Sequence, residues 1–301
     1  MAGAKLIRER MDSIRDTMKI TNAMYLISSS KLNKAKTDLE NARPHYEEVV
    51  EDISRLQRHL PATINNRYFK DPSDRSVRTI GYVLITADKG LAGAYNMNVI
   101  KLLQKELDQN PDCPYVLYVV GQIGRVALRK RHLPVDEMFQ YTAQNPSVHR
   151  ARVISGRLLE DYKSGRIGEI RIIYTSEVSA IESEAKLFRL LPLEKTKEDK
   201  EKGVEVKDDF EFLPSPEDVF HSLIPNYMTS VVYGTLIESF KCEQNARMIA
   251  MQAATDNATK MLQSLQLDYN RARQSGITQQ ITEVSGGARA QKKKKEMREK
   301  S

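Results

Sequence analysis

Apolar and small residues recur at alternating spacings of three and four positions through the first sixty residues. The series consists of Ile7, Met11, Ile14, Met18, Thr21, Tyr25, Ser28, Leu32, Ala35, Leu39, Ala42, Tyr46, Val49, Ile53, Leu56 and Leu60. This is a seven-residue repeat, and a helix that keeps such a repeat over many turns must supercoil in the left-handed sense around a partner helix. Residues 1–60 are therefore predicted to form one helix of a coiled coil.

The middle of this series is built from small side chains. Thr21, Ser28 and Ala35 stand where large aliphatic residues are usual, so two helix backbones can approach closely there. Two interpretations are open: a shaft that slides or turns inside a partner, and an ordinary tight crossing of two helices. This stretch alone favours the tight crossing.

The C-terminal third of the chain repeats the pattern. Its series consists of Met248, Met251, Thr255, Ala258, Leu262, Leu265, Tyr269 and Ala272. No proline follows Pro225, so a helix from about Pro216 to Ser285 is predicted, about 100 Å long at 1.5 Å per residue. Two terminal helices that are separated by a middle segment pair most simply in opposite directions. We therefore expect a long antiparallel coiled coil made of residues 1–60 and 216–288.

The middle of the chain, residues 77–193, has a different pattern. Strand signals at 78–87, 115–120 and 169–175 alternate with helical stretches at 95–108, 122–130 and 146–163. Such alternation predicts a Rossmann-like α/β domain with an open, largely parallel sheet covered on both faces. Residues 194–215 form a connector that begins with alternating charges. We expect a solvated loop there, and a binding role is the less favoured alternative.

Composition and charge favour an extended protein that does not bind nucleic acid. The 301 residues include no tryptophan, 7% aromatic and 29% charged residues. The net charge is +7, but residues 289–301 contain seven basic residues and two glutamates, so the body carries only +2. A charge confined to a tail argues against a nucleic-acid-binding face along the body.

Candidate chemistry is sparse. The five histidines are scattered singly, and Cys113 and Cys242 have no spacing suited to a metal or a disulfide framework. The glycine-bearing turn at 87–96 follows a strand and precedes a helix, but it matches no phosphate-binding motif, so we favour a tight turn over a nucleotide site. We expect no catalytic residue, no cofactor and no metal. No apolar run is long enough for a membrane span, and the N-terminus lacks a signal-like core.

Four blocks carry a family resemblance. They are MAGAKLIRERMDSIRDTMKITNAMYLISSSKL at 1–32, ITADKGLAGAYN at 85–96, ARMIAMQAATDNA at 246–258 and YNRARQSGITQQITEVSGGA at 269–288. Together, and in this order, they resemble the gamma subunit of F-type ATP synthases, and the resemblance spans the chain from Ala2 to Ala288. The combination of four ordered blocks is highly specific.

The resemblance implies a rotor without bond chemistry of its own. In the family, the paired terminal helices form a central shaft inside a ring of alternating alpha and beta subunits, and the α/β domain joins epsilon and the ring of c subunits. Proton or sodium flow turns the shaft, which couples ion flow to ATP synthesis or hydrolysis. The expected location is peripheral, on the cytoplasmic face of a bacterial cell membrane, and a processed mitochondrial chain is the alternative.

The resemblance also implies which residues touch the alpha/beta ring. Matched to the family's contact regions, they are Lys19, Thr21, Met24, Arg271, Arg273, Gln274, Thr278 and Gln279. Arginines offer several donors to acidic loops, and neutral side chains can make and release hydrogen bonds at modest cost. For Met24, packing beside the helix seam is an equally weighted alternative.

Three departures from the family pattern matter. Gln280 replaces a common glutamate, which removes a carboxylate from the contact region, and Ala87 and Lys89 replace a common serine and arginine. The basic tail at 289–301 extends beyond the usual end of the family. We favour a frayed or disordered extension, and the alternative is a brake that restrains rotation during hydrolysis.

Two rival functions remain open. A cytosolic coiled-coil tether would explain the heptads but not the four blocks, and a nucleic-acid-binding rod would need a basic stripe along the body. The three interpretations differ in what the chain should copurify with: ring subunits, another scaffold, or a nucleic acid bound in a salt-sensitive way.

Overall fold

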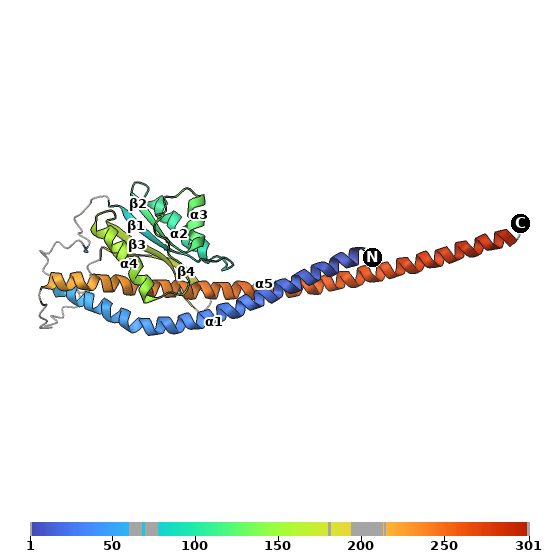
Figure 1. The fold of residues 1–301 in the computed structure, drawn as a ribbon, viewed down its shortest axis with the longest axis horizontal. Helices are drawn as coiled ribbons and strands as arrows, with labels where there is room; N and C mark the ends of the chain where they lie inside the picture. Colours follow the sequence, from blue (N-terminus) through green and yellow to red (C-terminus); the bar gives the residue numbers. More distant parts are fainter. Residues whose placement is uncertain are drawn as a thin grey trace. The chain divides into compact units, whose positions relative to one another are not determined.

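The chain folds into five helices and four strands within the residues that the computed structural model describes, which are 2–59, 68–69, 78–179, 182–193, 213 and 215–299. The elements are α1 (Ala2–His59), β1 (Ile80–Ile85), α2 (Tyr95–Gln109), β2 (Tyr115–Val120), α3 (Gln122–Lys130), α4 (Val148–Lys163), β3 (Glu169–Glu177), β4 (Ser183–Leu191) and α5 (Pro216–Glu299) (Figure 1). They divide into two compact units, one made of residues 28–248 and one of residues 1–27 with 249–301. Most of the charged connector predicted at 194–215 lies outside the described residues.

The sheet of the first unit is open and largely parallel, as predicted. Its strand order is β2-β1-β3-β4, with β1 parallel to both β2 and β3. The fourth strand, β4, pairs antiparallel with β3 and was not predicted. Its sequence, SEAKLFRLL, carries charged residues because β4 lies at the edge of the sheet, and this weakens the apolar pattern by which a buried strand is recognised.

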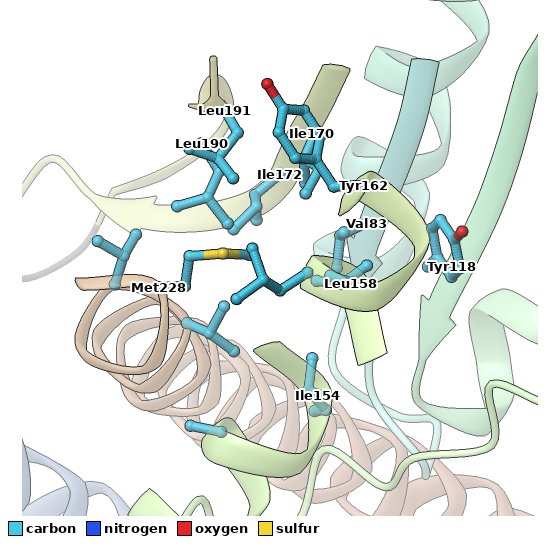
Figure 2. Packing of buried hydrophobic residues seen from close by; sticks show 14 of the residues in the cluster. Val83, Tyr118, Ile154, Leu158, Tyr162, Ile170, Ile172, Leu190, Leu191 and Met228 are labelled. Carbon is cyan, nitrogen blue, oxygen red and sulfur yellow. The ribbon is translucent and has the colours of Figure 1, made fainter. Parts of the chain in front are cut away.

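Each face of the sheet is covered by helices and has its own apolar core. Side chains of alternating strand residues point to opposite faces. Val83 and Ile85 pack with α4, α5 and the end of α1, whereas Tyr82 and Leu84 pack with α2 and α3. Figure 2 shows Met228 of α5 reaching the first core. The prediction of a sheet covered on both faces is confirmed, and the helix α5 is part of that cover.

In the unit of residues 28–248, α1 and α5 lie side by side and run in opposite directions (Figure 1). The predicted seam residues from Ser28 to Ile53 are buried or half-buried, apart from Tyr46, which is 40% exposed. The antiparallel helix pair is therefore confirmed in this unit.

The second unit contains the N-terminal part of α1 and the C-terminal part of α5. The hydroxyl groups of Thr21 and Thr255 lie 2.8 Å apart, within hydrogen-bonding distance, across the pair. Seam residues from Ile7 to Tyr25 and from Met251 to Ala272 are buried or half-buried, and their neighbours are mostly exposed. Small threonine side chains at this contact allow the close approach that the sequence predicted.

The helix α5 begins where the sequence predicted and ends later. The Ser215 side chain accepts a hydrogen bond from the backbone N–H of Asp218, and Pro216 occupies the first helical position, so both standard start signals are used. The predicted end near Ser285 is wrong, because the helix continues to Glu299. Gly286 and Gly287 each cost a helix about 1 kcal/mol, but the alanine, lysine, arginine, glutamine, methionine and glutamate residues after them are good helix formers.

Candidate functional site

The turn after β1, which the sequence analysis assigned to a tight connection, is fixed by the carboxylate of Asp88. One carboxylate oxygen accepts a hydrogen bond from the backbone N–H of Gln122 at 3.1 Å. The other accepts bonds from the backbone N–H groups of Ala143 and Gln144, at 2.8 and 3.1 Å, and from the Thr142 hydroxyl. Asp88 therefore ties the turn to the start of α3 and to the loop before α4.

The rest of the turn is held by its own residues. The Asn96 side chain accepts a hydrogen bond from the backbone N–H of Ala87 at 2.8 Å. Leu91 has a φ of 62° and is 63% exposed. A branched residue with a positive φ is uncommon and persists only where its surroundings fix the backbone. The turn is therefore a rigid part of the α/β domain.

Open α/β sheets usually bind ligands outside the carboxyl ends of their strands, at the point where strand order reverses. Here that point lies between β1 and β3, and α5 covers it. The Ser239 hydroxyl accepts a hydrogen bond from the backbone N–H of Thr175 at 3.1 Å. Glu238 accepts from the Ser176 hydroxyl at 2.6 Å and from the backbone N–H of Glu177 at 3.2 Å. The helix thus occupies the place that a small ligand takes in related folds.

The second contact of α5 with the domain is made by Arg247. Its guanidinium donates hydrogen bonds to the carbonyl oxygen of Lys89 at 2.9 Å and to that of Gly90 at 3.3 Å. The same guanidinium forms an ion pair with Glu243 at 2.7 Å, one helical turn earlier. Burial raises the pKa of the Glu243 carboxyl, and Arg247 opposes that rise. These contacts, with those of Glu238 and Ser239, make up what we call the joint between α5 and the α/β domain.

An apolar patch completes the joint. Ala87, Ala92 and Tyr95 of the turn and of α2 pack against Cys242 of α5. Burial raises the pKa of the Cys242 thiol to about 12, so the thiol stays protonated and unreactive near neutral pH. Cys113 is also a free thiol. The joint is therefore a contact that holds α5 against the α/β domain.

The structure places the three predicted ring-contact residues of α1 differently. Lys19 is exposed and forms an ion pair with Asp16 at 2.8 Å. Thr21 faces α5, where its hydroxyl contacts Thr255. Met24 is half-buried beside the seam. Lys19 is thus available to a partner, whereas the Thr21 hydroxyl is engaged within the helix pair.

The five predicted residues of α5 are all exposed. At 100° per residue, Arg271, Gln274 and Thr278 share one side of the helix, and Arg273 lies on the opposite side. The Gln279 side chain donates a hydrogen bond to Glu283 at 3.0 Å. The α1 and α5 groups do not come together: Thr21 lies opposite Thr255, sixteen residues or about 24 Å before Arg271 along the helix.

The joint was not predicted from the sequence. Arg247 and Glu243 are 7% and 2% exposed, which is unusual for charged residues. The sequence did contain a signal. Glu243 and Arg247 are charged residues four positions apart, and Lys241 and Gln244 nearby also interrupt the apolar pattern of α5. Polar residues on a helix face that should be buried indicate a partner with hydrogen-bonding groups.

Paired long helices joined to an open α/β sheet, one of them lying over the carboxyl ends of the central strands, define the class of fold to which the chain belongs. A family model described as ATP synthase matches residues 3–291. The chain is 43% identical to the ATP synthase gamma chain of Acetivibrio thermocellus, over 97% of this chain and 100% of that one. It is 38% identical to the gamma chain of Acetobacterium woodii, named as sodium ion specific, over 94% and 97%. The chain belongs to the family of ATP synthase gamma chains.

Solved structures support the fold. A chain from the Euglena gracilis mitochondrial ATP synthase, in a structure of its OSCP, F1 and c-ring parts, matches with a TM-score of 0.61 and 17% identity, over 96% of this chain and 94% of that one. A chain from the central stalk and c-ring of the Tetrahymena thermophila enzyme matches with a TM-score of 0.54 and 23% identity, over 78% and 99%. At such low identity these matches establish the shared fold alone.

Proposed function

We propose that this chain is the central-stalk subunit of a rotary ATP synthase. It turns inside a ring of alpha and beta subunits and couples ion flow through a c-ring to ATP synthesis or hydrolysis. This proposal rests on a sequence identity of about 40% to ATP synthase gamma chains, over nearly the full length of both chains. The coupling ion is either the proton or sodium, since one relative is named as sodium ion specific.

The proposed role is mechanical, and the catalytic chemistry belongs to the partners. In the described part of the chain, no three histidine, cysteine or carboxylate side chains gather in a way that suits a metal ion. The position where related folds bind small ligands is taken by Glu238 and Ser239 of α5. We infer that the chain transmits force between its partners: the alpha and beta subunits, epsilon and the c-ring.

The proposed location is the cytoplasmic face of a bacterial cell membrane. None of the helices in the described residues has an apolar stretch of the length needed to traverse a bilayer. Attachment would come through epsilon and the c-ring.

Copurification tests the proposed function. A tagged copy of the full chain, expressed in its host, should retain the alpha, beta and epsilon subunits and show magnesium-dependent ATP hydrolysis. Recovery of the chain with an unrelated cytosolic scaffold would favour the tether, and recovery with salt-sensitive nucleic acid would favour the rod. Either of those results, without ring subunits, would refute the rotor.

Single alanine substitutions of Arg271 or Arg273 should leave most of the torque in place. Both side chains are exposed, and an exposed ion pair contributes about 0 to 1 kcal/mol, which corresponds to less than about fivefold in any one step. Torque should be measured from the rotation speed of a probe of known drag on the assembled complex. Complete loss from either single change would contradict contacts that are spread over many residues.

We propose the brake as a second role for the C-terminal extension. The backbone of α5 is helical to Glu299, fourteen residues past Ser285, which adds about 21 Å of reach along the helix axis. A continuous helix projects in one fixed direction, so it can press against a surrounding ring, whereas a frayed tail would bend away.

Deletion of residues 290–301 tests the brake. ATP hydrolysis should rise severalfold while ATP synthesis stays the same, because only the backward direction is restrained. Both rates should be measured on the assembled enzyme in vesicles, with deletion of residues 300–301 as the control. Unchanged rates in both directions would dispose of the brake.

A further inference from the structure

The contact between Arg247 and the turn after β1 joins α5 to the α/β domain, within the unit of residues 28–248, through main-chain carbonyl groups. Two nitrogen atoms of the guanidinium, Nε and Nη2, donate to the carbonyl oxygens of Lys89 and Gly90. The planar fork of a guanidinium fixes direction as well as distance, which a flexible ammonium group does not. A twist of α5 relative to the turn would therefore distort several hydrogen bonds at once.

The turn is firmly attached to the α/β domain. Asp88 binds it to the start of α3 and to residues 142–144, and Asn96 binds it to the start of α2. The left-handed residue Leu91 directly follows the two carbonyl groups that Arg247 holds. A force on those carbonyl groups therefore reaches the whole domain instead of being absorbed by a flexible loop.

The guanidinium is in turn held by its own helix. Glu243 lies one turn before Arg247, and both side chains are more than nine-tenths buried. The second carboxylate oxygen of Glu243 makes no hydrogen bond within the described residues. The ion pair with Glu243 therefore helps to keep the guanidinium in one orientation.

In addition to the apolar core that α5 shares with the sheet and the ion pair of Lys241 with Glu177, α5 is attached to the domain at two further positions. Ser239 binds the end of β3, and Arg247 binds the turn after β1, eight residues or about 12 Å further along α5. Two contacts spaced along α5 keep the helix from tilting, and the directional hydrogen bonds at each contact resist a twist about the helix axis. The apolar patch around Cys242 lies between them but has no directional bonds.

We propose that Arg247 is the residue that couples rotation of helix α5 to the α/β domain, by holding the carbonyl oxygens of Lys89 and Gly90. This inference rests on the proposed rotor function and adds a specific positioning residue to it. Arg247 touches no nucleotide. It acts by stiffening the connection between the part of the chain that the ring would turn and the part that would join the c-ring.

The test is Arg247→Lys in the assembled complex, which keeps the positive charge beside Glu243 but removes the fork. With the ring immobilised and a probe fixed to the α/β domain, the angular fluctuations of the probe during a pause should broaden. Amide hydrogen exchange in residues 88–96 should speed up by about tenfold, the factor expected from loss of one charge-assisted hydrogen bond. Arg131→Lys is the matched control, because Arg131 is exposed at the end of α3 and should change neither readout.

Equal fluctuations and equal exchange in Arg247→Lys and the parent complex would overturn the proposal. Should Arg247→Lys fail to assemble, Glu243→Gln decides instead: it keeps the side-chain shape and removes the charge that orients the guanidinium, and the same broadening is expected. If the parent complex assembles and rotates, and the Glu243→Gln complex shows the same fluctuations and exchange as the parent, the coupling role alone is refuted. Failure of the parent chain to join any ring would refute the rotor function itself.

Discussion

Replacing Gly121 by alanine should destabilise the α/β domain by about 3 kcal/mol or more. The backbone φ at Gly121 is +93°, and an added Cβ would lie 2.1 Å from the carbonyl oxygen of Thr86. That oxygen belongs to the backbone directly after β1, so it cannot move aside as a side chain can. Urea denaturation of the full chain, followed by circular dichroism, should show the loss as a lower midpoint.

Gly165→Ala provides the control for this prediction. Gly165 also has a positive φ, +79°, but nothing lies within 4 Å of the position that an added Cβ would take, so only the conformational cost of about 1–2 kcal/mol applies. The difference between the two variants isolates the collision with Thr86. Equal midpoints for both would show that the region around Gly121 can rearrange, contrary to the close packing described.

Replacing Leu158 by alanine should cost about 3 kcal/mol, within the range of 2–5 kcal/mol for large-to-small changes in a close-packed core. Leu158 is fully buried in the core that α4, α5 and the sheet share, where Figure 2 shows it near Val83 and Met228. The loss should appear in the same denaturation experiment. A drop under about 1 kcal/mol would mean that the core collapses into the space left behind.

Leu267→Ala is the matched control for Leu158. Leu267 is 61% exposed on α5, so the same loss of three carbon atoms should change the free energy of unfolding by no more than about 0.5 kcal/mol. The comparison separates burial from the chemical nature of the substitution.

The elements that the sequence predicted best are those whose pattern is local. The heptads of α1 and α5 follow from spacing alone, and β2 and α3 begin and end at the predicted residues. The edge strand β4 was missed because its alternation is partly charged, and α5 ends later than predicted because good helix formers follow Gly286 and Gly287. In both cases the surroundings decided the structure: β4 forms by pairing with β3, and α5 continues because of the residues that follow the two glycines.

The site was harder to predict than the fold. Exposed residues such as Arg271 were selected through the family resemblance, and their contact with the alpha/beta ring stays a prediction. The joint depends on Arg247 meeting Gly90, 157 positions away in the sequence. Spacing and composition do not report such long-range pairs, so only the folded structure brings the guanidinium and the two carbonyl groups together.

The last part of α5 has a consequence for how this chain is made. From Ile277 to Gln291 every residue is exposed, and Ile277, Ile281 and Val284 share one side of the helix. Within the described residues no other part of the chain packs against this apolar strip, and an unpaired helix of such length is only marginally stable in water. Produced without partner subunits, this end of the chain should therefore unwind in part and promote aggregation.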